Sequence, residues 1–114
     1  MIKDYQPHLE KVKNSVSSIG FSLVKDDAYE ATFLNSDGWV IGLEGERYAR
    51  PAFDLSVSIN NSKFSVWLLM EVFNVTDKPS LTEQLRFISE KYKEIFVFPP
   101  PYLKQYDKAN EVDI

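Results

Sequence analysis

Three carboxylates lie on predicted strands with a spacing that points them to the same side of a sheet: Glu30, Glu44 and Asp54. Neighbouring carboxylates of this kind can act as an acid and base pair, as they do in glycoside hydrolysis. Such a site also needs a deep cleft, and a chain of 114 residues has little material to build one. We therefore favour a solvated or partner-facing surface, which antiparallel sheets commonly present.

A pattern close to a calcium-binding loop runs from Phe33 to Glu44 and includes Asn35, Asp37 and Gly38. Phe33 stands where such a loop needs its first Asp. The flanking residues alternate with period two, although the motif requires a helix on each side. An ordinary hairpin turn accounts for Asp37 and Gly38. The pattern therefore predicts a turn between two strands and no metal site.

Other catalytic chemistry has no matching set of residues. The only histidine, His8, follows Pro7 in a predicted helical turn, where we expect a solvated side chain. The chain has no cysteine, no GxSxG pattern and no glycine-rich loop that opens a helix. Acyl transfer and nucleotide binding are therefore not supported. The sequence predicts a protein that is not an enzyme and binds no cofactor.

The negative charge of the chain is concentrated in one segment. The formal net charge is −4, and residues 21–60 carry three basic and seven acidic side chains. The remaining residues are balanced, at +1 before this segment and −1 after it. Binding to nucleic acid needs clustered Lys and Arg to neutralise phosphates, so nucleic acid is not the expected ligand. An acidic surface favours a basic protein partner.

The ends and the composition of the chain bear on its location. The N-terminus carries charges and a proline where a secretory signal needs an apolar segment. No apolar run approaches the ~20 residues that span a bilayer. The absence of cysteine also suits a reducing compartment. We therefore expect a soluble cytoplasmic protein with no membrane partner.

Apolar spacing predicts the elements that must position the three carboxylates. A helix is expected over 7–18, because its apolar residues recur every three or four positions and Gly20 follows it. The run from Phe64 to Val75 fits a strand or a helix, and we expect at most a short strand before a helix near 66–74. Strands with one apolar face are predicted over 21–24, 28–35, 38–45 and 52–60.

The clearest predicted helix follows a capping box formed by Ser80 and Glu83. Its apolar stripe, from Leu81 to Phe96, is expected to pack on the sheet face that carries Trp39, Ile41 and Leu43. Three prolines at 99–101 must end this helix. Beyond them, we expect Tyr102, Leu103 and Tyr106 to hold the chain against the body.

The segment from Glu44 to Arg50 has the composition of a binding loop, because Tyr and Arg are enriched at interface hot spots. An exposed hairpin loop with locally paired charges explains this segment equally well. Together with the acidic residues of the strands, the loop completes the predicted partner-binding set: Glu30, Glu44, Glu46, Arg47, Tyr48 and Asp54.

One set of aromatic and apolar positions accompanies the order of helix, meander, short helix and capped long helix: Phe33, Trp39, Ile41, Leu43, Tyr48 and the run from Ser80 to Leu85. With these residues, the chain resembles small bacterial immunity proteins of contact-dependent or polymorphic toxin systems. The resemblance covers about residues 20–98. It implies a stoichiometric complex that blocks a toxin's active site or its substrate path, and many such toxins are basic nucleases.

The sequence therefore predicts an α+β fold in one domain, residues 1–114, with a frayed tail over 107–114. The predicted sheet is an antiparallel meander of four or five strands, with helices packed on one face. The leading function is that of a protein-binding module, most concretely an immunity protein. The alternatives are a small self-assembling or adaptor domain and, third, a ligand-binding or enzyme domain. A toxin gene upstream would favour the first function, and a deep pocket ringed by polar side chains would favour the third.

Overall fold

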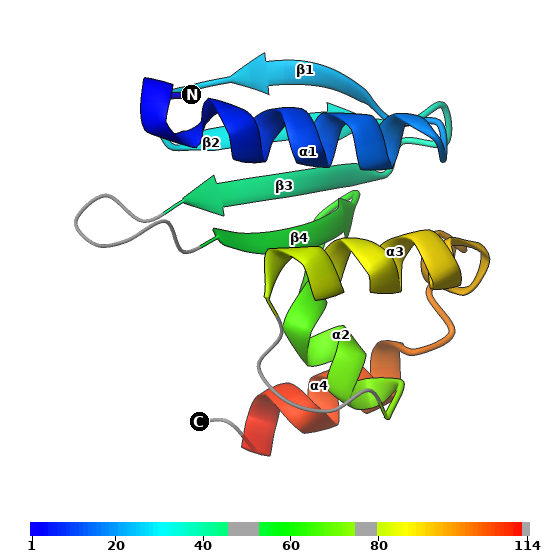
Figure 1. The fold of residues 1–114 in the computed structure, drawn as a ribbon. Coiled ribbons are helices and arrows are strands. Elements are labelled where there is room, and N and C mark those ends of the chain that lie inside the picture. The colour runs from blue at the N-terminus through cyan, green and yellow to red at the C-terminus, as the bar shows by residue number, and fades with distance from the viewer. Residues whose placement is uncertain (46–52, 75–79, 113–114) are drawn as a thin grey trace.

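The five strands of the sheet follow one another in space in the order in which they occur along the chain. The computed structural model describes residues 1–45, 53–74 and 80–112, and the features below refer to these. Antiparallel pairing throughout confirms the predicted α+β meander (Figure 1). The elements are η1 Lys3–Tyr5, α1 Gln6–Ser17, β1 Ser22–Asp26, β2 Glu30–Leu34, β3 Val40–Gly45, β4 Phe53–Ile59, β5 Ser62–Ser65, α2 Val66–Val72, α3 Leu81–Ile95 and α4 Leu103–Val112.

The two faces of the sheet differ sharply in burial, because successive side chains of a strand point to opposite sides. On β4, four alternate residues from Phe53 to Ile59 are buried, and the three between them are not. The same alternation runs through β2 and β3, as the apolar spacing predicts. One face therefore belongs to the core, and we call the opposite one the open face.

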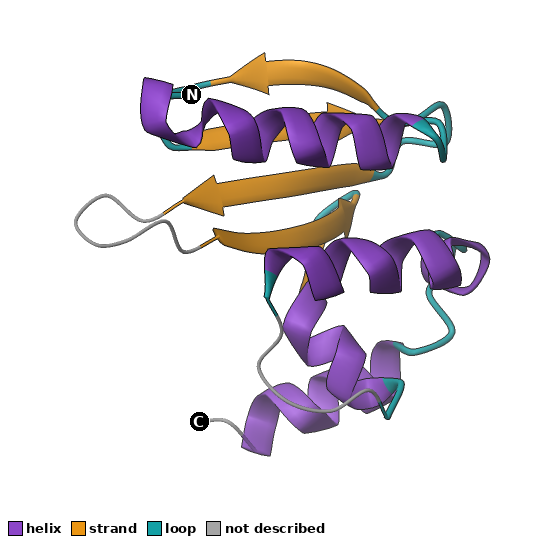
Figure 2. Ribbon diagram, viewed as in Figure 1, coloured by secondary structure: helices purple, strands orange, loops and turns teal. Residues whose placement is uncertain are grey.

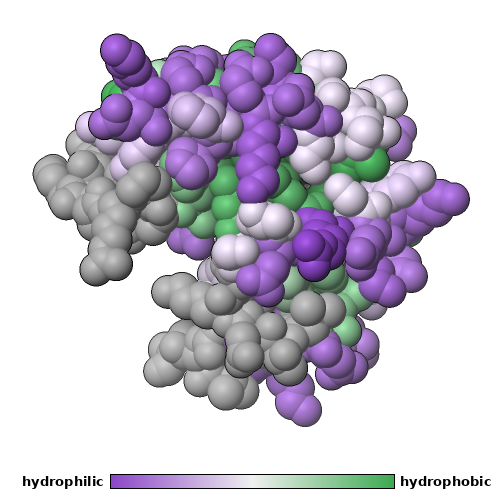
Figure 3. Space-filling view, in the orientation of Figure 1, coloured by the Kyte–Doolittle hydropathy of each residue, from purple (hydrophilic) through white to green (hydrophobic). Residues whose placement is uncertain are grey.

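Helices α1 and α3 lie side by side over the core face (Figure 2). Helix α1 packs on β1 and β2, and α3 packs on β4, while α2 packs against α4 and also contacts β4 and β5. Across the seam between α1 and α3, Lys11 donates a hydrogen bond to Thr82, and the Ser15 and Ser89 hydroxyl oxygens are 3.4 Å apart. Figure 3 views this side and shows hydrophilic residues gathered over α1, with hydrophobic residues visible in the seam.

Helix α3 begins as predicted, with both hydrogen bonds of the Ser80–Glu83 capping box present. Its apolar stripe reaches the sheet at β4. Phe96, the residue that caps the end of the helix, places its ring centroid 5.3 Å from that of Trp39, which directly precedes β3. Leu85 and Ile88 are buried as the stripe predicts, whereas Tyr92 is exposed. The helix thus covers the β4 side of the face, because α1 already occupies the other side.

A buried glutamine links α3 to the sheet, which the apolar stripe did not predict. Pairing between β4 and β5 stops at Ser56, so the Leu55 N–H donates to the Gln84 side-chain oxygen at 3.1 Å. Gln84 is 1% exposed and lies within the apolar core. A polar side chain is accepted there because it hydrogen-bonds a backbone group that would otherwise be buried without a partner.

Three other features differ from the sequence-based expectations. The helix expected near 66–74 is confirmed as α2, but the short strand before it, β5, begins at Ser62, earlier than Phe64. His8 is half-buried rather than solvated, because its ring lies 4.6 Å from that of Phe53. The tail expected to fray from residue 107 is helical as far as Val112.

Helix α4 is held to the body by two tyrosines. The rings of Tyr102 and Tyr106 meet Phe64 edge-on, with centroids 5.4 and 4.9 Å from its own. The Tyr102 hydroxyl donates to the Ile95 carbonyl at 2.8 Å, and burial raises the pKa of this hydroxyl above its usual range. Leu103, also expected to hold the tail, is exposed.

Candidate functional site

The acidic residues of the open face form a row across three neighbouring strands. Strand register places Glu30 of β2 opposite Glu44 of β3, and Glu44 opposite Asp54 of β4. All three side chains are exposed. We call these residues the acidic row. Sequence alternation predicts their common face, and the register shows that they are also direct neighbours.

Such a row opposes the stability of the sheet, because like charges directly opposite each other on adjacent strands repel. Among the described residues, Glu44 forms an ion pair with Lys63 of β5 at 3.2 Å, while Glu30 and Asp54 form none. The side chains of Lys63 and Glu44 are 63% and 53% exposed. An ion pair at this exposure contributes little, so it offsets the repulsion only in part.

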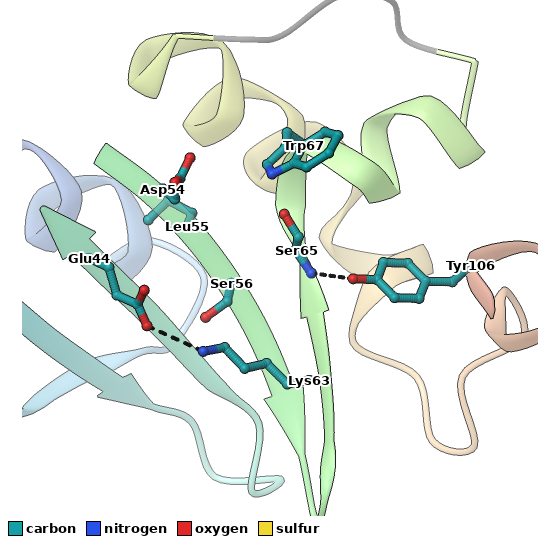
Figure 4. Close-up of a pocket in the computed structure, with 8 residues that line it drawn as sticks. All are labelled: Glu44, Asp54, Leu55, Ser56, Lys63, Ser65, Trp67 and Tyr106. Atoms are coloured by element: carbon teal, nitrogen blue, oxygen red, sulfur yellow. Dashed lines mark hydrogen bonds and ion pairs between the residues drawn. The ribbon is translucent and has the colours of Figure 1, made fainter. Parts of the chain in front are cut away.

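A polar cleft of about 310 Å³ opens at one end of the acidic row. Figure 4 shows Glu44 and Lys63 at one side of this space and Trp67, from the first turn of α2, at the other. The cleft lies on the open face, and one of its lining residues, Tyr106, also packs on Phe64 of the core. Its lining residues are Glu44, Asp54, Leu55, Ser56, Lys63, Ser65, Trp67 and Tyr106.

Local contacts keep the walls of this cleft in place. The Ser65 N–H donates to the Tyr106 hydroxyl at 2.7 Å, which ties α4 to the junction between β5 and α2. Gly42, the strand partner of the lining residue Ser56, has no side chain. A Cβ at that position would lie 2.7 Å from the Ser56 hydroxyl oxygen, closer than van der Waals contact allows.

A second hollow, of about 380 Å³, lies on the other side of Glu44. It is formed where the β1–β2 hairpin approaches the end of β3, and Asp27 and Glu30 add further carboxylates to it. Lys25 pairs with Asp27 at 3.3 Å, so one of these charges is partly balanced. The acidic row therefore separates two hollows, and Glu44 borders both.

The calcium-loop pattern folds as the hairpin that the flanking alternation predicts. The Asn35 side-chain oxygen accepts hydrogen bonds from the N–H groups of Asp37 and Trp39, at 3.1 and 2.8 Å. Gly38 takes a φ of +91°, which suits glycine in a tight turn. Within the described ranges, no group of three or more His, Asp or Glu side chains is arranged to hold a metal ion.

The structure unites half of the predicted partner-binding set. Glu30, Glu44 and Asp54 lie together in the acidic row. The other three residues, Glu46, Arg47 and Tyr48, lie outside the described residues.

Only Glu44 and Asp54 of the lining residues belong to the predicted set, but Lys63 and Trp67 each had a usable signal in the sequence. Lys63 alternates with Phe64, which is a core residue, and therefore points to the open face. The helical spacing of Val66, Leu69 and Met70 leaves Trp67 off their apolar stripe, so its ring is available to a surface cleft.

Comparisons of the chain with protein-family models, with curated proteins and with solved structures gave no match. In the part of the chain that the structure describes, no helix combines the length and the apolar character needed to cross a membrane.

Proposed function

We propose that this protein is a non-enzymatic binding module that neutralises a cognate bacterial toxin by forming a stoichiometric complex, as immunity proteins do. One observation carries the proposal. The open face holds three carboxylates in direct opposition, an arrangement that lowers the stability of the sheet and that burial of the core does not require. Residues that oppose folding are typical of functional surfaces.

The charge of the acidic row indicates the chemistry of the partner. A surface of one sign attracts a partner of the opposite sign and accelerates the encounter. The expected partner is therefore a basic protein, such as a nuclease-type toxin, rather than a nucleic acid. Complex formation would place the sheet over the toxin's active site or over the path of its substrate.

The test is co-expression of this chain with the product of the adjacent gene in a bacterial host. The proposal predicts that cells survive induction of that product only when this chain is present, and that the two proteins co-purify as one complex. A toxic product that kills cells equally with and without this chain would contradict the proposal. A matched culture carrying Ile41→Ala tests for dependence on the fold, because Ile41 is fully buried.

Self-assembly is the second candidate, and an exposed apolar segment favours it. Between α3 and α4, Val97 and Phe98 are 40% and 61% exposed, and Leu103 lies close by in the chain at 40%. Exposed apolar patches commonly mark interaction sites.

Light scattering over a hundredfold range of protein concentration distinguishes the two functions. A constant mass of 13.2 kDa is expected for the immunity function. Dimerisation that Phe98→Ser abolishes is expected for self-assembly.

A further inference from the structure

We propose that the cleft lined by Glu44, Asp54 and Trp67 receives an arginine side chain of the basic protein partner. This inference rests on the proposed function and adds to it the chemical group that is recognised. The cleft brings together two carboxylates from neighbouring strands and an indole from α2. No single element of the sequence contains this combination.

The charges of the cleft select a cation. Asp54 and Glu44 supply two negative charges, and Lys63 supplies one positive charge. Within the described residues, the Asp54 carboxylate has no hydrogen bond or ion pair, so an incoming cation displaces no partner among them. Glu44 engages Lys63 through an exposed ion pair, which an arriving guanidinium can replace at little energetic loss.

The indole distinguishes arginine from other cations. Trp67 is half-buried and forms a wall of the cleft, with its ring in contact with the open space (Figure 4). A planar guanidinium stacks on an aromatic face and donates two parallel hydrogen bonds to a carboxylate, whereas an ammonium acts as a point charge. Tryptophan gives the strongest cation–π interaction of the aromatic residues.

The size of the cleft also fits one side chain. Its volume of about 310 Å³ lies at the small end of ligand pockets, which range from about 300 to 1,000 Å³. The hydroxyls of Ser56 and Ser65 line the same space and offer additional acceptors for the five N–H groups of a guanidinium. Tyr106 holds the Ser65 backbone through its hydrogen bond, so this wall is formed before a ligand arrives.

The experiment uses N-acetyl-arginine amide as the probe and the ¹⁵N-labelled full chain. The neutral citrulline analogue, which has nearly the same shape, is the control ligand. The two tryptophan side chains report separately, because Trp39 is 1% exposed in the core and Trp67 lines the cleft. The expected result is a saturable shift of the Trp67 indole signal with the arginine probe. The Trp39 signal stays in place, and the citrulline probe has no effect.

Matched variants then assign the shift to the cleft. Glu44→Gln combined with Asp54→Asn should weaken binding at least tenfold, because both carboxylate charges are removed. Glu10→Gln combined with Glu90→Gln removes the same charge from exposed positions on α1 and α3 and should leave binding unchanged. Lys63→Gln should tighten binding by up to about fivefold, because it removes a neighbouring like charge.

Four results would overturn the inference. These are no shift of Trp67 in the wild-type chain, an equal shift with citrulline, unchanged binding in the double cleft variant, or weaker binding in Lys63→Gln. None of them bears on toxin neutralisation, which the co-expression test measures independently. Conversely, failure to protect against the toxin together with specific arginine binding would contradict the proposed function and leave the cleft as an arginine site.

Discussion

The same strands form both faces of this sheet, yet the two faces differ in composition. In β2, β3 and β4, the core face buries apolar residues at alternate positions under α1 and α3. The open face has small polar residues along its centre, and at one end it opposes Glu30, Glu44 and Asp54. Burial of apolar area accounts for the first pattern. It gives no reason for the second, and this difference is why we propose that the partner binds the open face.

The largest expected effect on the free energy of unfolding comes from substituting two neighbouring residues of β3 that point to opposite faces. Ile41→Ala should lower the free energy of unfolding by ~2–5 kcal/mol, because Ile41 is fully buried in the core. Val40→Ala, its control on the open face, should lower it by less than about 1 kcal/mol. Urea denaturation of both variants makes the measurement, and equal losses would remove the distinction between the faces.

Gln84 tests how α3 is attached to the core face. Gln84→Leu keeps the volume but removes the acceptor for the Leu55 N–H, so the free energy of unfolding should fall by about 1–3 kcal/mol. Hydrogen exchange at the Leu55 amide should also accelerate more than exchange at Leu43, its strand partner. Unchanged exchange at Leu55 would mean that this contact does not hold the helix to the sheet.

The capping box tests the start of the same helix. Ser80→Ala removes the hydroxyl that accepts from the Glu83 N–H, and we expect a loss of about 1 kcal/mol in unfolding free energy. Binding of the partner should not change, because α3 covers the core face. Chemical denaturation beside the wild-type chain measures the first effect, and an unchanged midpoint would show that the cap does not stabilise α3.

The smallest expected effect is a gain in the free energy of unfolding, whereas the substitutions above lower it. Glu30→Gln removes one of two directly opposed charges, so it should raise the unfolding free energy by about 0.2–1 kcal/mol. The gain should shrink in 1 M salt, where the Debye length is about 3 Å. Thermal unfolding at two salt concentrations measures it. A destabilised variant would mean that the acidic row contributes to folding, which would weaken its assignment to binding.

Patterns within single segments predicted most of the fold. Alternation located β2, β3 and β4, and the Ser80–Glu83 spacing located the start of α3. Both are properties of short stretches, so they can be read without knowing the fold. Helix α4 was missed because three prolines precede it and most of its residues are polar or charged. Its stability depends on distant contacts of Tyr102 and Tyr106 with Phe64.

The candidate site could be predicted only in part, for the same reason. Alternation places Glu30, Glu44 and Asp54 on one face, but strand register decides that they are neighbours. The cleft also needs Lys63 and Trp67, which come from β5 and α2 and reach β3 and β4 only through the tertiary fold. The burial of Gln84 likewise depends on where the pairing of β5 ends, which no local pattern reveals.

The central claim is that the partner binds the open face through the acidic row. Surface plasmon resonance against the product of the adjacent gene, at two salt concentrations, tests it with two charge-matched variants. Glu44→Lys with Asp54→Lys should slow association by about tenfold or more and flatten its salt dependence. Glu10→Lys with Glu90→Lys makes the same charge change on the helices and should cause a smaller, non-specific slowing. Equal slowing by both pairs, or wild-type kinetics for the first pair, would contradict the claim.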